Sequence, residues 1–451
     1  MVNQPNHSLQ PNTKKILLKG GRVINPATGI DEVMDVLMFD GKIKAIKYDI
    51  KPEKADEVIQ LTPDHWVVPG LVDIHVHFRD LEQSHKETIE TGANSAIAGG
   101  YTSVCIMPNT QPTLDNVEVL RTLKEKMAQV PVKMYPITAV TQGIMGDTLT
   151  DMKSMHQQGA VGFTDDGRCI MNAERMRQAL LIGKECNVPV MCHEENYELV
   201  AGGCMNEGPT SEKLGVKGHP NAAESVMVAR DAELARQTGG HVHICHISTR
   251  EAVDWVRFAK QQGWKVTAEV TPHHFSLADT MLSNGDPDYK MCPPLRSDLD
   301  CEAMIEGLKD GTIDAIATDH APHSADEKAL PLTQAPNGVV GLETAVGVGY
   351  TYLVKPGHLT PMQWVEKMTS APAGVCQLDA GNIFPGNAAD VTVIDTTCEW
   401  VVEPDGLKSK SKNTCFKGMT LTGKAVMTLV DGHILMNQLV VDDAIKTPAS
   451  L

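Results

Sequence analysis

The feature that most constrains the fold of this chain is a regular alternation of short β-branched runs with longer helical stretches. Eight such runs lie between residues 67 and 320, and the segments between them carry apolar residues at helical spacing. The runs are 67–78, 101–108, 132–140, 160–166, 188–193, 241–247, 265–271 and 313–319. Because this alternation builds βαβ units and a parallel sheet, eight units over about 250 residues predict an α/β protein with a TIM-type (β/α)8 barrel.

Both chain ends have a different pattern. Residues 15–60 and 389–436 consist of short runs that are broken by Gly-Gly and Asp-Gly turns, which is typical of antiparallel β-structure. Neither end has enough strands to be stable alone. We therefore predict one small β-sandwich formed by residues 1–66 and 385–451, with residues 67–384 as the barrel and catalytic domain.

Charge and composition exclude several classes of protein. The net charge of −17 repels polyphosphate, and no basic run contains interleaved aromatic residues, so nucleic-acid binding is not expected. No apolar stretch approaches the roughly 20 residues that span a bilayer, so no membrane span is expected. The polar N-terminus and the odd number of cysteines, 11, predict a cytoplasmic protein. The only charge-biased stretch, residues 408–412, is predicted to be a solvated loop.

The first strand of the predicted barrel ends in residues that suit a metal site. Because side chains alternate along a strand, His75, His77 and Arg79 lie on one face at the carboxyl end, where the active sites of barrel enzymes lie. Two imidazoles at this spacing reach one metal ion. Taken alone, the pair is equally compatible with half-buried histidines that are bonded to their neighbours.

The ends of four other strands favour the metal site. Asp165 and Asp166, His193, His246 and Asp319 follow strands four, five, six and eight. Asp and His are poor core residues, so packing alone does not explain their presence at five of eight strand ends. Four histidines and two carboxylates suit a pair of divalent ions that share one carboxylate and a water.

Four further histidines lie on strands six and seven. His241 and His243 lie earlier on strand six and are predicted to be hydrogen-bonded barrel residues. His273 and His274, at the end of strand seven, are compatible with either role.

Several longer motifs point to a known family. They are Asp-x-His-x-His-x-Arg at 73–79 and the segments 85–92, 99–102, 107–110, 163–167, 293–296, 317–323 and 409–414. Together they resemble the cyclic amidohydrolases and, within them, the bacterial class I dihydroorotases. The resemblance covers nearly the whole chain.

The resemblance implies a ligand set of six residues for two Zn²⁺ ions. His75 and His77 bind the first ion, His193 and His246 bind the second, and Asp166 bridges both together with a hydroxide. Hydantoinases and allantoinases have a carboxylated lysine in the bridging position, and this chain has no lysine there. Asp319 completes the first zinc site and acts as the general base and acid.

The resemblance also implies how the substrate is held. Arg79, Asn109 and His323 match the residues that bind the substrate carboxylate. The full predicted substrate set is His77, Arg79, Asn109, Cys292, His323, Asn337 and Gly338. Two positions depart from the family pattern, because Cys292 replaces an Asn that contacts the ring and Asn337 replaces a Phe.

The activity implied is the reversible, zinc-dependent hydrolysis of (S)-dihydroorotate to N-carbamoyl-L-aspartate in de novo pyrimidine (UMP) biosynthesis. A hydantoinase, allantoinase or dihydropyrimidinase is the alternative, but a ring without a carboxylate leaves Arg79 and Asn109 unpaired. A non-catalytic scaffold is a further alternative, although such relatives typically lose metal ligands and this chain keeps all six. The family also implies a homodimer and, in some members, association with aspartate carbamoyltransferase.

Overall fold

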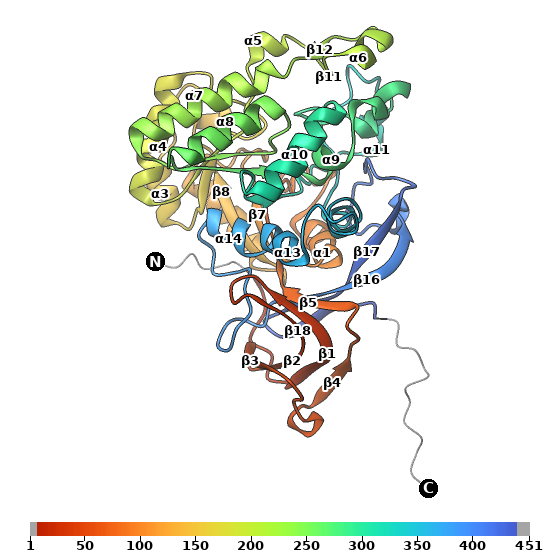
Figure 1. Cartoon of the computed structure of the whole chain (residues 1–451). Coiled ribbons are helices and arrows are strands. Elements are labelled where there is room, and N and C mark those ends of the chain that lie inside the picture. The colour runs from red at the N-terminus through yellow and green to blue at the C-terminus, as the bar shows by residue number, and fades with distance from the viewer. Residues whose placement is uncertain (1–6, 440–451) are drawn as a thin grey trace.

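The computed structural model describes residues 7–439, which form a barrel with helices around it and a second sheet at one end (Figure 1). Residues 1–6 and 440–451, which the predicted end segments include, lie outside the described residues. The boundaries at 66/67 and 384/385 remain predictions.

Eight parallel strands within the described range form the barrel sheet. In spatial order they are β15 (Ala315–Ile316), β14 (Val266–Val270), β13 (Val242–Ile244), β10 (Val190–Cys192), β9 (Gly162–Thr164), β8 (Lys133–Thr138), β7 (Tyr101–Ile106) and β6 (Leu71–Val76). The predicted (β/α)8 barrel is therefore confirmed. The run 67–78 is corrected to two strands, because β5 (His65–Pro69) pairs with the strands of the other sheet and β6 pairs with β7.

The first and last barrel strands are joined near the predicted site. Val76 forms a bridge with His320, and the backbone N–H of His77 donates to the carbonyl of His320 at 2.9 Å. Deeper in the barrel, the buried carboxylate of Asp73 accepts a hydrogen bond from Thr318 Oγ1 at 2.6 Å. These contacts hold the carboxyl end of the first strand against that of the eighth.

Helices follow the strands and cover the outside of the barrel (Figure 1). The α-helices are α1 (Ile89–Gly99), α2 (Val117–Met127), α3 (Met152–Gln157), α4 (Ala173–Cys186), α5 (Tyr197–Val200), α6 (Pro209–Leu214), α7 (Ala222–Thr238), α8 (Arg250–Gln261), α9 (Pro272–Ser276), α10 (Asp298–Asp310), α11 (Ala325–Lys328), α12 (Ala345–Gly349), α13 (Pro361–Met368) and α14 (Ser370–Val375). Short 3₁₀ or π segments are η1 (Pro52–Lys54), η2 (Gln142–Ile144), η3 (Asp279–Asn284), η4 (Pro287–Tyr289), η5 (Tyr350–Val354) and η6 (Pro404–Gly406), and a small pair of strands, β11 (Met205–Asn206) and β12 (Gly218–His219), lies between α5 and α7.

Helix α1 illustrates how local sequence sets these boundaries. The Thr88 side chain accepts a hydrogen bond from the backbone N–H of Thr91, which caps the first turn. The helix ends at Gly99 and is capped by Gly100, whose φ of 90° lies in the left-handed region that glycine adopts without steric cost. The next barrel strand begins at the following residue, Tyr101.

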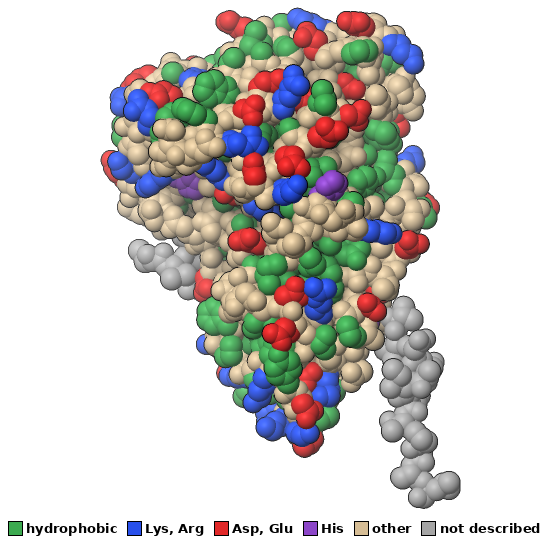
Figure 2. Space-filling model, in the orientation of Figure 1, with side chains coloured by type: hydrophobic (Ala, Val, Ile, Leu, Met, Phe, Trp, Pro, Cys, Tyr) green, Lys and Arg blue, Asp and Glu red, His purple; other side chains and the backbone are tan. Residues whose placement is uncertain are grey.

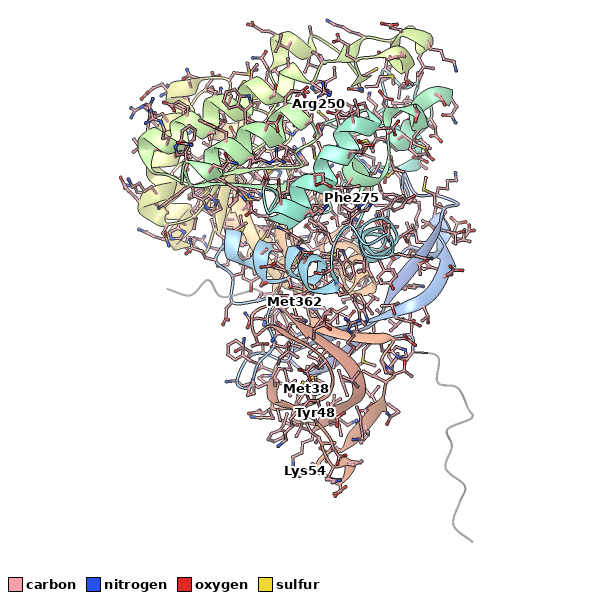
Figure 3. The ribbon with its side chains drawn as sticks, in the orientation of Figure 1. Met38, Tyr48, Lys54, Arg250, Phe275 and Met362 are labelled. Carbon is pink, nitrogen blue, oxygen red and sulfur yellow. The ribbon has the colours of Figure 1, made fainter. Side chains whose placement is uncertain are left out.

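The second sheet combines both chain ends, as predicted. Its spatial order is β18 (His433–Asn437), β17 (Thr420–Val430), β16 (Val391–Val401), β5, β1 (Ile16–Asn25), β2 (Ile30–Phe39) and β3 (Lys42–Lys47), with β4 (Glu57–Gln60) paired to β1. The sheet surrounds a core of its own, to which Met38 belongs, and Tyr48 and Lys54 lie toward its far end (Figure 3). Lys133 of the barrel forms ion pairs at 2.8 Å with Asp390 and Asp431, which join the two parts of the chain.

Acidic and basic side chains are intermixed on the face shown in Figure 2. Among residues 7–439, no helix has the length and apolar character needed to cross a membrane.

Candidate active site

A cavity of about 260 Å³ lies at the carboxyl ends of the barrel strands. Its lining residues are His77, Arg79, Asn109, Asp166, Gly167, His193, Glu195, His246, Cys292, Asp319, Ala321, His323, Asn337 and Gly338. Every predicted site residue except His75 is among them. His75 is fully buried, and its Nε2 lies 3.4 Å from the Asp166 carboxylate.

The carboxylate of Asp166 lies between two pairs of histidines. Its Oδ2 is 3.4 Å from Nε2 of His75 and of His77. Its Oδ1 is 3.3 Å from Nε2 of His246 and 3.8 Å from Nδ1 of His193. The structure therefore brings the two predicted histidine pairs together on opposite oxygens of one carboxylate.

These atoms suit divalent cations. His75, His77 and Asp166 form one close group of donor atoms, and Asp166, His193 and His246 form another. His75 Nε2 and Asp166 Oδ1 are buried and have no hydrogen-bond partner in the described chain. Unpaired buried polar atoms are costly, and imidazole nitrogens with a carboxylate oxygen are common ligands of first-row metals. The residues therefore fit a site for bound metal.

Charge around Asp166 keeps the carboxylate ionised. Burial alone raises its pKa, but the neighbouring histidines, His75 foremost, hold the pKa well below its ordinary value. Burial likewise opposes ionisation of Asp319, and contacts with His77 and His75 lower the pKa of that carboxyl. Both acids are therefore ionised at neutral pH and can attract a cation.

Hydrogen bonds on the outer nitrogens orient three of the histidines. Nδ1 of His77 lies 2.7 Å from Asn109 Oδ1, and Nδ1 of His75 lies 2.5 Å from Glu269 Oε1. Nε2 of His193 lies 3.5 Å from Glu195 Oε2. When the rings are neutral, each of these oxygens accepts a hydrogen bond from the outer nitrogen, and the opposite ring nitrogen then has its lone pair on the side of the Asp166 carboxylate.

Asn109 also presents a hydrogen-bond donor to the cavity. Its Oδ1 is occupied by His77, which leaves the amide N–H₂ as a donor. Gly167, with φ of 83°, lies beside it, and a Cβ at that position would be only 3.0 Å from Asn109 Nδ2. Glycine at this position therefore leaves room for the amide.

Three residues of the site have an unusual backbone conformation. Arg79, His246 and Asp319 have φ of 34°, 31° and 46°. Non-glycine residues rarely adopt such values, and strain of this kind is concentrated at functional sites. Each of these residues lies two or three positions after the end of a barrel strand and lines the cavity.

Arg79 provides an unpaired cation beside the histidine pairs. The residue is 9% exposed and forms no ion pair with a carboxylate of the described chain. Its Nε donates to the carbonyl of Pro322 at 3.4 Å, and its Nη2 lies 3.5 Å from His323 Nε2. The remaining guanidinium donors are available to an anionic ligand.

His323 is neutral and bonded on both nitrogens. Burial, then the charges of Arg79 and Lys86, lower its pKa to about 3. Nδ1 accepts a hydrogen bond from Lys86 Nζ at 3.3 Å, and Nε2 donates to the carbonyl of Asn337 at 2.8 Å. The ring therefore joins the Arg79 side of the cavity to the segment of Asn337 and Gly338.

Cys292 also lines the cavity and lies beside Glu195, which the sequence analysis missed. Its Sγ donates to Glu195 Oε1 at 3.3 Å, and burial raises the pKa of the thiol to about 11. Burial opposes ionisation of Glu195, but His193 and His219 lower its pKa to about 2. The only available signal for Glu195 was its position two residues after His193.

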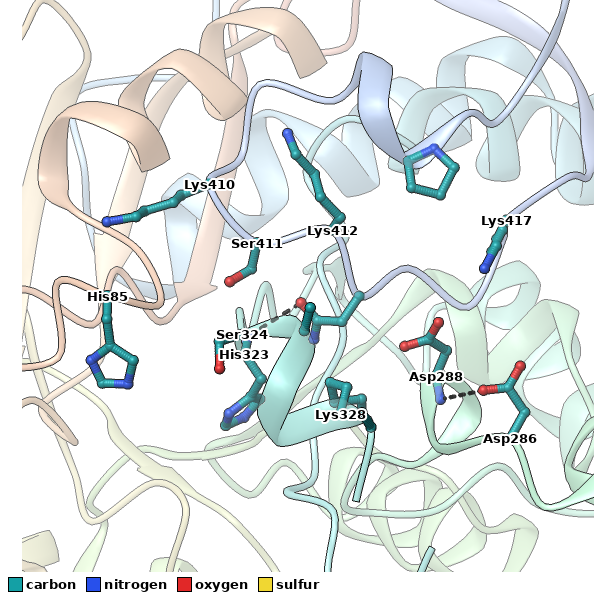
Figure 4. Close-up of a pocket in the computed structure, with 14 residues that line it drawn as sticks. His85, Asp286, Asp288, His323, Ser324, Lys328, Lys410, Ser411, Lys412 and Lys417 are labelled. Atoms are coloured by element: carbon teal, nitrogen blue, oxygen red, sulfur yellow. Dashed lines mark hydrogen bonds between the residues drawn. The ribbon is translucent and has the colours of Figure 1, made fainter. Parts of the chain in front are cut away.

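The prediction that residues 408–412 form a solvated loop is right for Lys408 and Lys410, which are exposed outside any helix or strand, and wrong for the two serines. Ser409 and Ser411 are buried, and their hydroxyls donate to the Glu87 carboxylate and to the Lys86 carbonyl. The alternating lysines Lys410 and Lys412 instead line a cavity of about 520 Å³ on the other side of His323 (Figure 4). The error arose because the alternation is that of an extended segment with one face buried.

Asn413, which follows this segment, connects it to the active site. Its Oδ1 accepts from the backbone N–H of His323 at 3.1 Å, and its Nδ2 donates to the carbonyl of Gly338 at 3.0 Å. The C-terminal part of the chain therefore holds two segments of the cavity wall.

Of the four further histidines on strands six and seven, His241, His243 and His274 are hydrogen-bonded within the barrel, whereas Nε2 of His273 is buried without a partner in the described chain. His241 and His243 both contact Thr267 Oγ1, as predicted for bonded barrel residues. His274 lies 3.0 Å from the carbonyl of Pro293. His273 does not line the cavity, and burial lowers its pKa to about 4.

Comparisons with known proteins identify the family to which the chain is similar. A family model described as Dihydro-orotase-like matches residues 64–252. The chain is 47% identical over 427 residues to a dihydroorotase of Pelotomaculum thermopropionicum, covering 95% of this chain and 100% of the relative. It is 44% identical over 423 residues to a dihydroorotase of Anaeromyxobacter dehalogenans, covering 93% and 97%. Among solved structures it is similar to an L-hydantoinase (dihydropyrimidinase) from Arthrobacter aurescens, with a TM-score of 0.85, 25% identity and coverage of 95% and 97%.

Proposed function

The chain belongs to the dihydroorotase family, and we propose that it opens and closes the ring of dihydroorotate in the cavity at the carboxyl ends of its barrel strands. The reaction is the reversible hydrolysis of (S)-dihydroorotate to N-carbamoyl-L-aspartate, a step of de novo pyrimidine (UMP) biosynthesis. One observation carries the choice of substrate. The unpaired Arg79 guanidinium lies in the same cavity as two groups of donor atoms that share Asp166.

We propose two zinc ions as the resident metal. His75, His77 and Asp319 hold the first, His193 and His246 hold the second, and Asp166 is shared. Zinc is favoured because histidine nitrogens make up most of the donor set. Metal at this position lowers the pKa of water toward neutrality and polarises a carbonyl oxygen.

The proton transfers are assigned to Asp319. Its Oδ1 lies 2.9 Å from His77 Nε2, and its pKa is held below the ordinary range, so it is ionised before the reaction. The carboxylate accepts the proton of the attacking water and then donates it to the ring nitrogen that departs. The same carboxylate performs both transfers in reverse when the ring closes.

The substrate carboxylate is assigned to Arg79, Asn109 and His323. The guanidinium offers paired donors, and the Asn109 amide offers another because its oxygen is occupied by His77. His323 reaches the same anion when its Nε2 exchanges the Asn337 carbonyl for the ligand. Cys292, Asn337 and Gly338 then face the ring.

The alternative substrates are neutral rings such as hydantoin or dihydrouracil. They leave the buried Arg79 without an anion, and that desolvated charge has a free-energy cost. A scaffold without activity is disfavoured because the six proposed ligands are all present.

Initial rates on four substrates test the proposal. The purified protein, with its metal content measured in parallel, is incubated with dihydroorotate, N-carbamoyl-aspartate, dihydrouracil and hydantoin. We expect turnover of the first two compounds and little of the others. A faster reaction with dihydrouracil or hydantoin would contradict the choice of substrate and leave only the assignment of a metal-dependent amidohydrolase.

The cellular context is proposed from the family alone. A homodimer, association with aspartate carbamoyltransferase and a cytoplasmic location remain predictions. Sedimentation of the purified protein, alone and mixed with aspartate carbamoyltransferase, tests the first two.

A further inference from the structure

A chain of hydrogen bonds runs from His75 through the interior of the barrel. His75 Nδ1 lies 2.5 Å from Glu269 Oε1, and the other oxygen of Glu269 lies 3.1 Å from His243 Nε2. His243 Nδ1 is 2.8 Å from Thr267 Oγ1, which is 2.7 Å from His241 Nε2. His241 also lines a separate cavity of about 340 Å³. This series of hydrogen bonds therefore connects that cavity to His75, a proposed metal ligand.

Metal binding requires neutral imidazoles. With the histidines neutral and Glu269 ionised, only one arrangement of protons satisfies each bond. The carboxylate only accepts, so His75 carries its proton on Nδ1 and His243 carries its proton on Nε2. His243 Nδ1 must then accept from the Thr267 hydroxyl, whose oxygen accepts from His241 Nε2. Every donor in this series of hydrogen bonds therefore points toward Glu269.

This arrangement has a direct consequence at His75. With the proton on Nδ1, the lone pair of Nε2 points toward Asp166, and Nε2 is one of the buried atoms without a hydrogen-bond partner. A carboxylate on the outer nitrogen also raises the basicity of a ligating imidazole. We propose that Glu269 is a positioning residue that fixes the protonation pattern and orientation of His75 for metal binding. Thr267 and His243 hold Glu269 in turn.

Packing alone does not explain these side chains. The interiors of such barrels are filled mainly by branched apolar residues, whereas His75, His243 and Glu269 are each 0% exposed. A buried carboxylate has a large desolvation cost unless it is fully paired. Glu269 has a partner on each oxygen, and one partner is the proposed ligand.

Metal affinity measures this role without reference to activity. Metal-free wild type and Glu269→Gln are titrated with zinc in competition with a chromophoric chelator. An amide has no charge, and because it accepts on one side and donates on the other, it cannot accept from both histidines as the carboxylate does. We expect Glu269→Gln to bind zinc about 10- to 100-fold more weakly.

Two further variants serve as controls. Glu87→Gln removes an equally buried glutamate that binds Ser409 and Lys410 and contacts none of the proposed ligands. Glu87→Gln should keep its zinc affinity within about twofold of the wild type. Thr267→Val reaches Glu269 only through His243, so its zinc affinity should fall less than that of Glu269→Gln. Equal affinity in Glu269→Gln and wild type overturns the inference.

A second measurement uses the wild type alone and therefore does not depend on whether a variant folds. Nitrogen-15 NMR of the zinc-loaded, histidine-labelled wild type should show His75 with its proton on Nδ1, hydrogen-bonded to a carboxylate. A proton on Nε2 overturns the inference. The inference rests on the proposed metal site, and the two failures are distinguishable. A wild type that binds no zinc contradicts the proposed function, whereas a wild type that binds zinc as tightly as Glu269→Gln contradicts only the role of Glu269.

Discussion

His77 Nε2 lies 2.9 Å from Asp319 Oδ1, although the two residues are 242 positions apart in the chain. The contact places the proposed general base beside the first proposed metal ligand. Asp319→Asn keeps the shape of the side chain and removes its capacity to accept a proton. We expect kcat to fall by about 10²- to 10⁴-fold, with an unchanged melting temperature. A variant that retains more than about a tenth of wild-type kcat contradicts the role of Asp319 as general base and acid. The control is Asp326→Asn, at an exposed position.

Asp166 and its neighbour Asp165 offer a matched pair of substitutions. Asp165 is also buried, but its carboxylate binds Thr141, away from the histidines. Asp166→Ala should lower the metal content of the purified protein, whereas Asp165→Asn should leave it unchanged. Elemental analysis of both variants measures this. Mass spectrometry that finds a carboxylated lysine in the wild type counts against Asp166 as the bridge.

Arg79 should be sensitive even to substitution by lysine. A guanidinium binds a carboxylate through two parallel donors, whereas an ammonium provides only a point charge. A lost hydrogen bond to a charged group is worth about 1.5 to 3 kcal/mol, so kcat/KM for dihydroorotate should fall about 10- to 150-fold in Arg79→Lys. Steady-state kinetics test this, with the exposed Arg168→Lys as the control. Equal kinetics in both variants exclude a carboxylate contact at Arg79.

Cys292 lines the cavity with a weak hydrogen-bonding group. Its thiol faces Glu195, whereas an amide at this position supplies both a donor and an acceptor to the ring. Cys292→Asn should raise kcat/KM for dihydroorotate by the equivalent of about 0.5 to 1.5 kcal/mol. An unchanged or lower kcat/KM indicates that the ring does not contact this position.

Stability should depend on pH through His241. Burial, then the charge of His243, lowers the pKa of His241 from 6.5 to about 4. Between these values the unfolded chain binds more protons than the folded one, so the free energy of unfolding falls as the pH drops from 6.5 toward 4. One such histidine contributes at most about 1.4 kcal/mol per pH unit. Urea unfolding of wild type and His241→Gln across this range should show a shallower slope for the variant, and identical slopes exclude the assignment.

The barrel was predictable because its signal is local and repeated. Each of the eight runs contains a barrel strand, and only 67–78 was misassigned. Strand β5 ends at Pro69 and Gly70 separates it from β6, and this Pro-Gly pair was a signal for the break that the periodicity did not reveal. The convergence of the proposed ligands was also predictable, because residues at strand ends converge in a barrel whatever the details of packing.

The residues that orient those ligands were not predictable in the same way. Glu269 is hydrogen-bonded to His75, 194 positions away, and Glu195 to Cys292, 97 positions away. Such pairs depend on register and rotamers rather than on any local pattern. The buried serines of 408–412 were missed for a related reason, since their acceptors, such as the Glu87 carboxylate, lie on distant segments.

A zinc titration of the metal-free protein, followed by dihydroorotate hydrolysis, tests the central claim most directly. The claim is that two ions that share Asp166 support the opening of a ring whose carboxylate is bound by Arg79. Turnover should be absent without metal, should rise with added zinc and should level off at two ions per chain. Full turnover in the metal-free protein, or no turnover of dihydroorotate at any zinc concentration, would contradict the account.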